Sequence, residues 1–577
     1  MFNKLISKFK INKYSMIKHG TVAFITMFGV GMFFGVKNIM IAFPIAITSA
    51  VMSRQNFQVK KTSKVFRIIA LDLLIVFISF LSSQNIYLGV PINFISIFLI
   101  IYTVVSPYDL TFYKPFIMLY VFTQYASISL AELPNRFLAV IFGVLVVVVG
   151  SFIHMEDEKK ILGKNVINTL NNFKKQIENI LHGEFDEALL ISSSKSMREL
   201  VYRIYITRHK KYLTTNLGRF QFKIFIAIEH MNLNLKKIYK DYLKGEIEKE
   251  VIEDLLLIVD YIIFYSEGNI ESSELLKYSY EISDKYIDPL KYPYNLMDTV
   301  LLLVENIKEI ELLGKKEINK VYKEWQRSDL DRIKTTFKEY FNPESIRYKF
   351  AMRMAITLTM ALFIGETLGY YKIIWVIITI MSIMQPYYED TLSRTKERIV
   401  GNVIAIIFTG VTINFINIRW VTVLILIISL YLLYGFKDYS KISLFAAVAS
   451  ICISSLTENI NTLIFYRVSY VLVGVLVIIL VNRYLFPYKL EYGIEDLKKK
   501  IIKLSNMLIG ESIKNIARQK ETNDIRDIII HTTLLCHKLY LRNLKEKREE
   551  IDKFIDSNTN LVVEVGYKIL FEMGGGS

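Results

Sequence analysis

The sequence predicts an all-α fold: a polytopic membrane protein of two parallel six-span repeats, with a helical cytoplasmic domain. Three observations lead to this fold class. Hydrophobic residues make up 52% of the 577 residues, and they concentrate in two blocks, 19–153 and 346–487. Basic residues recur at alternate connections between the apolar runs of each block. The two blocks also align at a constant offset of 331 residues, which pairs Arg136 with Arg467.

Each block is long enough for about six membrane spans, because a bilayer core about 30 Å thick needs about 20 mostly apolar residues per helix. Polar residues, Pro and Gly divide the first block into segments at 19–36, 38–53, 66–84, 88–105, 113–130 and 136–153. They divide the second block at 346–365, 371–385, 398–416, 419–435, 441–456 and 464–486. Several segments are short, so we expect some neighbouring pairs to be tilted or partly re-entrant.

The basic residues predict the orientation. Lysines cluster before the first span, and Lys and Arg cluster after the second span and at the start of the second block. Because cytoplasmic loops are enriched in Lys and Arg, we expect both termini and both hydrophilic segments in the cytoplasm, and the spans in a bacterial plasma (inner) membrane. The first apolar run lacks a small-residue cleavage site, so it is interpreted as a retained helix rather than a signal peptide.

The predicted domains follow from these boundaries. They are a first transmembrane repeat at 1–153, a cytoplasmic helical domain at 154–345, a second transmembrane repeat at 346–487, a C-terminal cytoplasmic helical segment at 488–573 and an engineered linker at 574–577. The hydrophilic segments show helical periodicity. In the stretch 163–181, apolar residues recur at steps of three and four, namely Val166, Leu170, Phe173, Ile177 and Ile180.

The duplication extends into the hydrophilic segments. After a slip of three residues, RELVYRIYITRHKKYL (198–213) aligns with RDIIIHTTLLCHKLYL (526–541), pairing His209 with His537. Because each block holds an even number of spans, the repeats should be parallel and related by a pseudo-two-fold axis along the membrane normal. Transporters commonly place their substrate between such halves. A duplicated scaffold without a pathway is the alternative.

Composition and motifs argue against several function classes. The formal net charge is +16, but lysine is interspersed with glutamate along helical stretches, which is typical of solvated faces. We therefore expect no nucleic-acid partner. The sequence contains neither a Walker A motif nor a catalytic constellation, and its seven histidines form no metal-binding pattern. We expect no enzymatic activity, no cofactor and no metal. Cys452 and Cys536 give no disulfide framework.

The polar stretch IMQPYYEDTLSRTKERIVGN (383–402) lies between two almost wholly apolar runs. Pro386 is expected to end the preceding helix, because its ring removes a backbone donor, and Asp390 to cap the next one. Arg394 and Arg398 then share one helix face. Two guanidiniums on one face can bind a carboxylate, so this stretch is a candidate anion-attracting vestibule. The alternative is that these arginines only set the topology or pair with nearby acids.

The same stretch resembles a motif of a known family. It carries a Pro–aromatic element, a threonine, two arginines and a glycine entering the next helix, seen here as Gln385-Pro386-Tyr387-Tyr388, Thr391, Arg394, Arg398 and Gly401. Together with the doubled six-span block, this resembles the fusaric acid resistance and aromatic acid exporter family, related to plant aluminium-activated malate transporters. Asn402 and Ala405 depart from the pattern, where Thr and a second Gly are usual. The resemblance implies export of aromatic or related organic acids, driven by the proton gradient.

Asp72 is the candidate proton-coupling residue, because acids inside membrane spans are rare and usually face a cavity or a partner. An ion pair with Arg67 or with another arginine across the bundle is the alternative. Arg136 and Arg467 are interpreted as anchors at extracellular span starts, although their recurrence at aligned positions also permits a role near an outer gate. The indole of Trp375 is interpreted as an interfacial ring. Arg67 aligns with Arg398 at the offset of 331. The candidate substrate-binding residues are therefore Arg394, Arg398, Arg67, Tyr388 and Thr391.

The sequence thus predicts an exporter of small organic acids that is embedded in the lipid bilayer. A passive organic-anion channel is one alternative, because the resemblance to the malate transporters allows it. A membrane scaffold that recruits partners through its cytoplasmic helical domain is another. The identity of the acid, the coupling ion, homo-oligomer formation and the role of the cytoplasmic domain are left open.

Overall fold

The computed structural model describes residues 11–52, 61–104, 108, 112–153, 158–208, 211–286, 296–314, 316–327, 342–369, 372–416, 418–456, 458–518 and 523–572. The chain forms two compact units. The first joins Met1–Met155 to Glu339–Gly493, and the second joins Glu156–Lys338 to Ile494–Ser577. In the described residues, helices are the regular structure apart from two isolated antiparallel bridges. The all-α prediction is confirmed.

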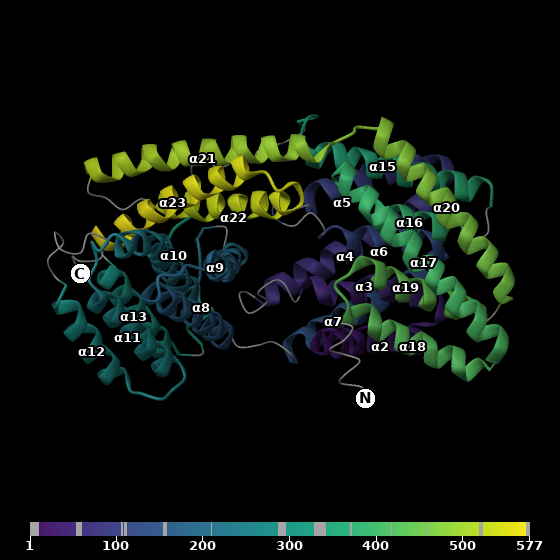
Figure 1. Cartoon of the computed structure of the whole chain (residues 1–577). Helices are drawn as coiled ribbons and strands as arrows, with labels where there is room; N and C mark the ends of the chain where they lie inside the picture. Colours follow the sequence, from purple (N-terminus) through teal and green to yellow (C-terminus); the bar gives the residue numbers. More distant parts are fainter. Residues whose placement is uncertain are drawn as a thin grey trace. The chain divides into compact units, whose positions relative to one another are not determined.

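The first unit is a bundle of apolar helices (Figure 1). In chain order, its α-helices within the described ranges are α2 (Lys13–Phe34), α3 (Ile39–Met52), α4 (Lys61–Ser83), α5 (Ile86–Val104), α6 (Lys114–Tyr125), α7 (Leu133–Ile153), α15 (Ile346–Thr367), α16 (Ile374–Ile383), α17 (Tyr388–Ile416), α18 (Arg419–Gly435), α19 (Tyr439–Ser455) and α20 (Ile460–Tyr484). Each lies at one of the predicted spans.

Seven of these helices are long and apolar enough to cross a membrane, namely α2, α4, α5, α7, α15, α17 and α20. Apolar side chains such as Phe415 and Leu424 are exposed, as expected of faces that contact lipid rather than water. The chain is a helical membrane protein. Shorter apolar helices, including α16, α18 and α19, lie beside the seven, and the count of six spans per repeat stays a prediction.

The helix α17 differs most from its predicted span. It begins at Tyr388, whereas the span was expected from residue 398. Asp390 therefore lies in the first turn, beside Glu389, and the prediction that it caps the helix is wrong. The physical reason is that helical backbone geometry starts directly after the Pro386 break. Acidic side chains in that first turn still favour the positive end of the helix.

The helices of the two predicted repeats pack against each other reciprocally. The first helix of the first repeat, α2, packs against α18, which is the fourth helix of the second repeat. The first helix of the second repeat, α15, packs against α5, the fourth helix of the first. Within the halves, α3 packs on α7 and α16 packs on α20.

Glycines at aligned positions permit these close contacts within each half. A Cβ at Gly143 of α7 would lie 3.2 Å from the side chain of Ile45 in α3. A Cβ at Gly474 of α20 would lie 2.8 Å from Thr379 and 3.4 Å from the carbonyl oxygen of Val376, both in α16. Val376 and Ile45 align at the same offset as the two glycines. The same positions therefore make the same helix contact in both halves.

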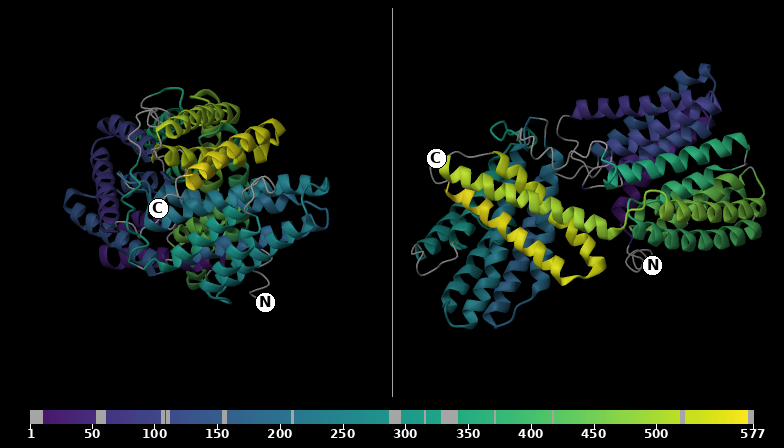
Figure 2. Two further views of the ribbon diagram at one scale, coloured as in Figure 1. Left: turned by 90° about the vertical axis from the view of Figure 1, so that its left-hand side faces the viewer. Right: turned by 90° about the horizontal axis from the view of Figure 1, so that it is seen from above.

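The second unit is formed from two segments that are far apart in sequence. Its helices in the described ranges are α8 (Glu158–Leu181), α9 (Glu187–Thr207), α10 (Asn216–Leu243), α11 (Lys249–Ser266), α12 (Ser272–Asp284), α13 (Leu296–Leu312), α22 (Asn523–Glu546) and α23 (Glu549–Glu572), together with most of α21 (Leu490–Arg518). The periodic residues predicted on α8 are all buried, which confirms its apolar face. Figure 2 shows α21 running beside α23, where Ser505 donates to Asn558 at 2.7 Å. His209, which aligns with His537 in the predicted repeat, lies outside the described residues.

Candidate functional site

The break between α16 and α17 is held by a buried arginine. Arg353 of α15 has no solvent-exposed surface. Its Nη2 donates to the carbonyl oxygen of Gln385 at 3.2 Å and to that of Pro386. Its Nη1 donates to Oδ1 of Asn482 in α20. These two carbonyls lie at a helix break and need partners from outside the helix. The guanidinium supplies them, and it thereby fixes the start of α17.

Thr391 and Tyr388 take part in the same turn. The Thr391 hydroxyl accepts from the backbone N–H of Gln385 at 3.1 Å and is 1% exposed. Tyr388 is half-buried, and its backbone N–H donates to the carbonyl oxygen of Tyr488 at 3.0 Å. The structure therefore gives Thr391 a backbone partner inside the protein. A contact of either residue with substrate stays a prediction.

The neighbouring acids do not neutralise the arginines of this stretch. The Glu389 carboxylate accepts from the backbone N–H of Leu490 at 2.8 Å, at the start of α21. The Glu397 carboxylate accepts from the Ser393 hydroxyl at 3.3 Å. Among the described residues, neither Arg394 nor Arg398 forms an ion pair. The alternative that these arginines pair with adjacent acids therefore finds no support in this geometry.

Arg394 and Arg398 lie one turn apart on α17 but in different surroundings. Arg394 is half-buried, and its guanidinium carbon lies 4.3 Å from the ring centroid of Tyr439 in α19, a cation–π contact. Arg398 is 3% exposed, and its Nε is buried without a hydrogen-bond partner. The face predicted from the sequence therefore runs from a half-exposed guanidinium to one in the protein interior.

Arg398 lies close to a second buried guanidinium. Asn402, one turn further on α17, donates from Nδ2 to the carbonyl oxygen of Arg398 at 2.8 Å and accepts at Oδ1 from Nε of Arg467 at 3.1 Å. Arg467 of α20 is 1% exposed, its Nη1 has no hydrogen-bond partner, and Arg398 repels it electrostatically. Its guanidinium carbon lies 5.1 Å from the ring centroid of Trp375.

The structure corrects interpretations drawn from the sequence for three side chains. Arg136 and Arg467 were expected to be interfacial anchors and Trp375 an interfacial ring, but their exposed fractions are 1%, 1% and 3%. Helical numbering gives the depth of a residue along a span and not the direction in which it faces, so these side chains were assigned to the wrong surroundings. The recurrence of Arg467 at the offset of 331 was the one signal that singled it out.

The pair of arginines is electrostatically costly as it stands. A charged side chain at the centre of a membrane helix costs about 2.5–3.5 kcal/mol on insertion scales, and an unpaired buried charge is strongly destabilising. Close helix packing holds the pair in place. A Cβ at Gly401 would lie 2.6 Å from the carbonyl oxygen of Ser440 in α19, so only glycine allows this approach. A bound anion would offset the charge.

Tyrosine hydroxyls adjoin the half-exposed arginine. The hydroxyls of Tyr113, which precedes α6, and of Tyr439 are both buried without a hydrogen-bond partner. Arg394 and Arg353 both act electrostatically on Tyr113. Sequence reasoning missed this group because its members come from four separate elements.

The first half places its candidate residues differently. Arg67 of α4 is exposed, and no contact in the described structure joins it to Arg394 or Arg398. Asp72, also on α4, is 1% exposed, and neither of its carboxylate oxygens has a hydrogen-bond partner. The described residues show no ion pair between Asp72 and Arg67. The buried acid and the buried arginine pair thus belong to different halves.

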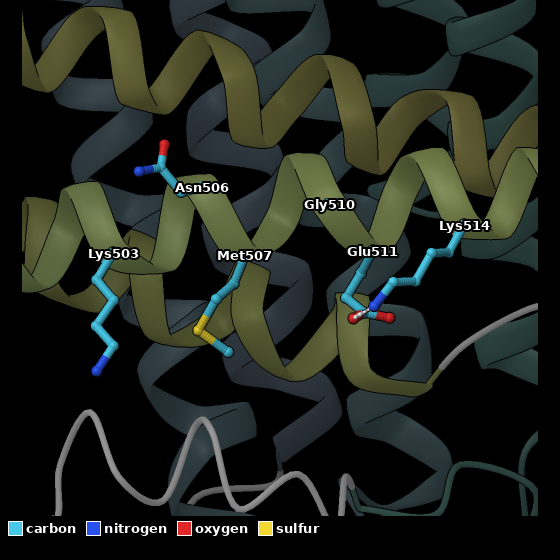
Figure 3. A pocket seen from close by; sticks show the side chains of 6 residues that line it. All are labelled: Lys503, Asn506, Met507, Gly510, Glu511 and Lys514. Carbon is cyan, nitrogen blue, oxygen red and sulfur yellow. Dashed lines mark hydrogen bonds and ion pairs between the residues drawn. The ribbon is translucent and has the colours of Figure 1, made fainter.

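A separate hollow lies on the surface of the second unit. Its lining comes from one face of α21, namely Lys503, Asn506, Met507, Gly510, Glu511 and Lys514 (Figure 3). Gly510 lacks a side chain and leaves the space open, and Lys514 pairs with Glu511 at 2.9 Å. Because a single helix supplies the whole lining, the hollow does not enclose a ligand, and we assign it no role.

A family model matches the part of the chain that contains the arginine pair. Residues 360–481, which include Arg398 and Arg467, match the model of a family described as fusaric acid resistance protein-like. The chain is 26% identical over 133 residues to the inner membrane protein YccS of Escherichia coli (strain K12). That match covers 22% of this chain and 18% of the relative. No solved structure matches significantly. The resemblance to this family of membrane transporters is confirmed.

Proposed function

We propose that this protein exports small organic anions, aromatic acids among them, across the bacterial inner membrane, and that the proton gradient drives export. The observation that carries the proposal is the buried guanidinium of Arg398, with its Nε free of protein partners, in a helical membrane unit. Few side chains are as costly to bury in a membrane without a partner. An anionic substrate supplies that partner during transport.

The path begins at the half-exposed guanidinium of Arg394. There the guanidinium attracts the acid. The Tyr439 ring offers an aromatic face, and the hydroxyls of Tyr113 and Tyr439, which have no hydrogen-bond partner in the protein, offer donors. Arg398 lies one turn further along α17 and receives the anion in the interior. The reciprocal packing of α2 on α18 and of α15 on α5 supports two parallel repeats related by a pseudo-two-fold axis. In that arrangement the two halves open the path alternately.

Asp72 carries the proton in this proposal. Its carboxylate is buried and has no hydrogen-bond partner, so it is most stable when protonated and becomes charged only when water or a cation reaches it. A carboxyl group of this kind can take up a proton from one side and release it to the other. Acid exit and proton entry would then use groups from different halves of the bundle.

Uptake of radiolabelled benzoate into inside-out proteoliposomes tests the proposal. We expect Arg398→Ala to reduce the initial rate by about tenfold or more, because a charge-assisted hydrogen bond to the acid is lost. Arg419→Ala is the matched control, since Arg419 is an exposed arginine of the same half. Both variants are compared at equal protein content. Unchanged affinity and rate in Arg398→Ala would contradict the proposal.

Electrical recording separates a transporter from a channel. In voltage-clamped bilayers the proposal predicts no sustained benzoate current. Currents far above the turnover of a transporter would instead favour the passive anion channel. If the variants of Arg394, Arg398 and Asp72 all keep wild-type function while deletion of the hydrophilic residues 155–340 abolishes it, the scaffold alternative is favoured.

A further inference from the structure

The geometry points to one anion site formed jointly by Arg398 and Arg467, with Asn402 as the residue that orients it. This inference rests on the proposed function and goes beyond it, because it assigns the interior site to a second arginine and an asparagine that were not among the candidate substrate-binding residues. The ligand is defined by its chemistry. It is a single carboxylate group, or an oxyanion of similar size, that bridges two guanidiniums.

Both guanidiniums have donor capacity that the protein leaves unused. Arg398 and Arg467 are 3% and 1% exposed, so bulk water has little access to their guanidinium groups. The Nε of Arg398 and the Nη1 of Arg467 are buried without partners. A buried guanidinium normally satisfies its donors with carboxylates or carbonyl oxygens. Here two such groups, close enough to repel each other, both remain incomplete.

Asn402 explains how the guanidinium of Arg467 is held beside Arg398 without being neutralised. Its amide nitrogen donates to the carbonyl oxygen of Arg398 at 2.8 Å and to the Ser443 hydroxyl at 3.3 Å. These two acceptors fix the orientation of the amide, so its oxygen faces Nε of Arg467 at 3.1 Å. The side chain thus positions Arg467 through a neutral group. The positive charge of the pair stays available to a ligand.

The aligned arginine of the first half provides a contrast. Arg136 is also 1% exposed, and its Nε donates to Oδ1 of Asn38 at 3.0 Å. Its Nη1 donates to the carbonyl oxygen of Thr123 at 3.2 Å, and Glu132 attracts it electrostatically. Its Nη2 lacks a partner, but no second arginine of the described residues accompanies it. The chain therefore contains an internal control with the same arginine–asparagine contact and no arginine pair.

The experiment uses this control. Asn402→Asp places a carboxylate on Nε of Arg467 and supplies the missing counter-charge from within the protein. Asn38→Asp makes the same chemical change beside Arg136. Binding is measured on the full chain in nanodiscs through the emission of Trp375, titrated with acetate and with benzoate. The protein has three tryptophans, so Trp375→Phe identifies the part of the signal that belongs to the site.

We expect Asn402→Asp to weaken acetate and benzoate binding by about tenfold or more, because the introduced carboxylate occupies the cationic pair. Asn38→Asp should bind both acids within about twofold of the wild type. The melting temperature of Asn402→Asp in the absence of ligand should equal or exceed that of the wild type, since a buried unpaired charge is neutralised. This measurement shows that lost binding is not lost folding.

Two results would overturn the inference. The first is wild-type affinity in Asn402→Asp, and the second is an equal loss in Asn402→Asp and Asn38→Asp. A further variant, Arg467→Gln, should also weaken binding, and unchanged affinity there counts against the site in the same way. Transport is assayed in parallel. If the wild type carries benzoate while Asn402→Asp binds it normally, the inference fails and the proposed function stands. If acetate changes the Trp375 emission of the wild type but the wild type transports no acid, the proposed function fails and the binding site stands.

Discussion

Arg136 in the first half and Arg467 in the second lie at aligned positions, are equally buried, and each contact an asparagine through Nε. They differ in what lies around them. Arg467 adjoins the buried Arg398, whereas the aligned partner of Arg398 is the exposed Arg67. The first half instead buries Asp72. Among the described residues, the helix contacts and the buried aligned arginine recur in both halves, whereas the buried partner arginine lies in the second half and the buried acid in the first.

The largest effect we expect comes from the acid of the first half. Asp72→Asn should reduce benzoate uptake driven by a pH gradient to the level of empty vesicles, because an amide cannot carry a proton. Exchange of labelled for unlabelled benzoate without a gradient should continue, since the arginine pair is intact. Asp72→Glu keeps the carboxyl group and is the control. Gradient-driven uptake that persists in Asp72→Asn would remove this residue from the coupling mechanism.

The next effect tests whether the close approach of α17 to α19 at Gly401 holds the arginine pair of the second half in place. Gly401→Ala should destabilise the protein by about 2 kcal/mol, because the added methyl group would lie 2.6 Å from the carbonyl oxygen of Ser440 and 3.0 Å from the backbone nitrogen of Leu444, both in α19. Ala70 aligns with Gly401 and is exposed. Ala70→Val adds more volume, yet it should change stability by about 0.5 kcal/mol or less.

Melting temperatures of the purified variants in detergent measure both changes. If Gly401→Ala has the same melting temperature as the wild type, the close approach of α17 to α19 is not what holds Arg398 and Asn402 in the interior.

A smaller effect compares the two aligned glycines of the shared helix contact. Gly474→Ala and Gly143→Ala should each lower stability by about 1 kcal/mol through overpacking. Gly474→Ala should cost more, because its methyl group would lie 2.8 Å from Thr379, against 3.2 Å from Ile45 for Gly143→Ala. The same melting assay ranks the two variants. A clear reversal of their order would show that the aligned contacts are not equivalent.

The smallest effect is expected at Arg67. Although it aligns with Arg398, its exposed side chain lacks a contact to the arginine pair in the described structure. Arg67→Gln should therefore change benzoate affinity by about twofold or less. Concentration dependence of uptake measures this affinity, with Arg398→Gln compared at equal protein content. A loss as large as that of Arg398→Gln would instead support the prediction that Arg67 binds substrate.

The sequence predicted the helices of this protein better than the chemistry between them. Apolar periodicity placed the buried face of α8 correctly, and the apolar runs located the ends of the helices of the first unit to within six residues, except for the start of α17. That start was missed because it depends on partners from outside the local sequence. The backbone N–H of Tyr388 bonds to Tyr488, and Arg353 supplies donors to the break before it.

The candidate site was predicted only in part for a similar reason. The spacing of Arg394 and Arg398 defines a helix face from the local sequence alone. Arg398 lies near Arg467 because α17 packs against α19 and α20. Local periodicity does not predict contacts between helices that are far apart in the sequence. The exposed Arg67 makes the same point, since alignment with Arg398 gave no information about which way its side chain faces.

A structure of the full chain in nanodiscs with 4-bromobenzoate tests the central claim most directly, because the bromine marks the ligand. The account predicts a bound carboxylate within hydrogen-bond distance of both Nε of Arg398 and Nη1 of Arg467, with the Asn402 amide in its present orientation. Ligand found only elsewhere, or both guanidiniums turned toward lipid with no space between them, would contradict it.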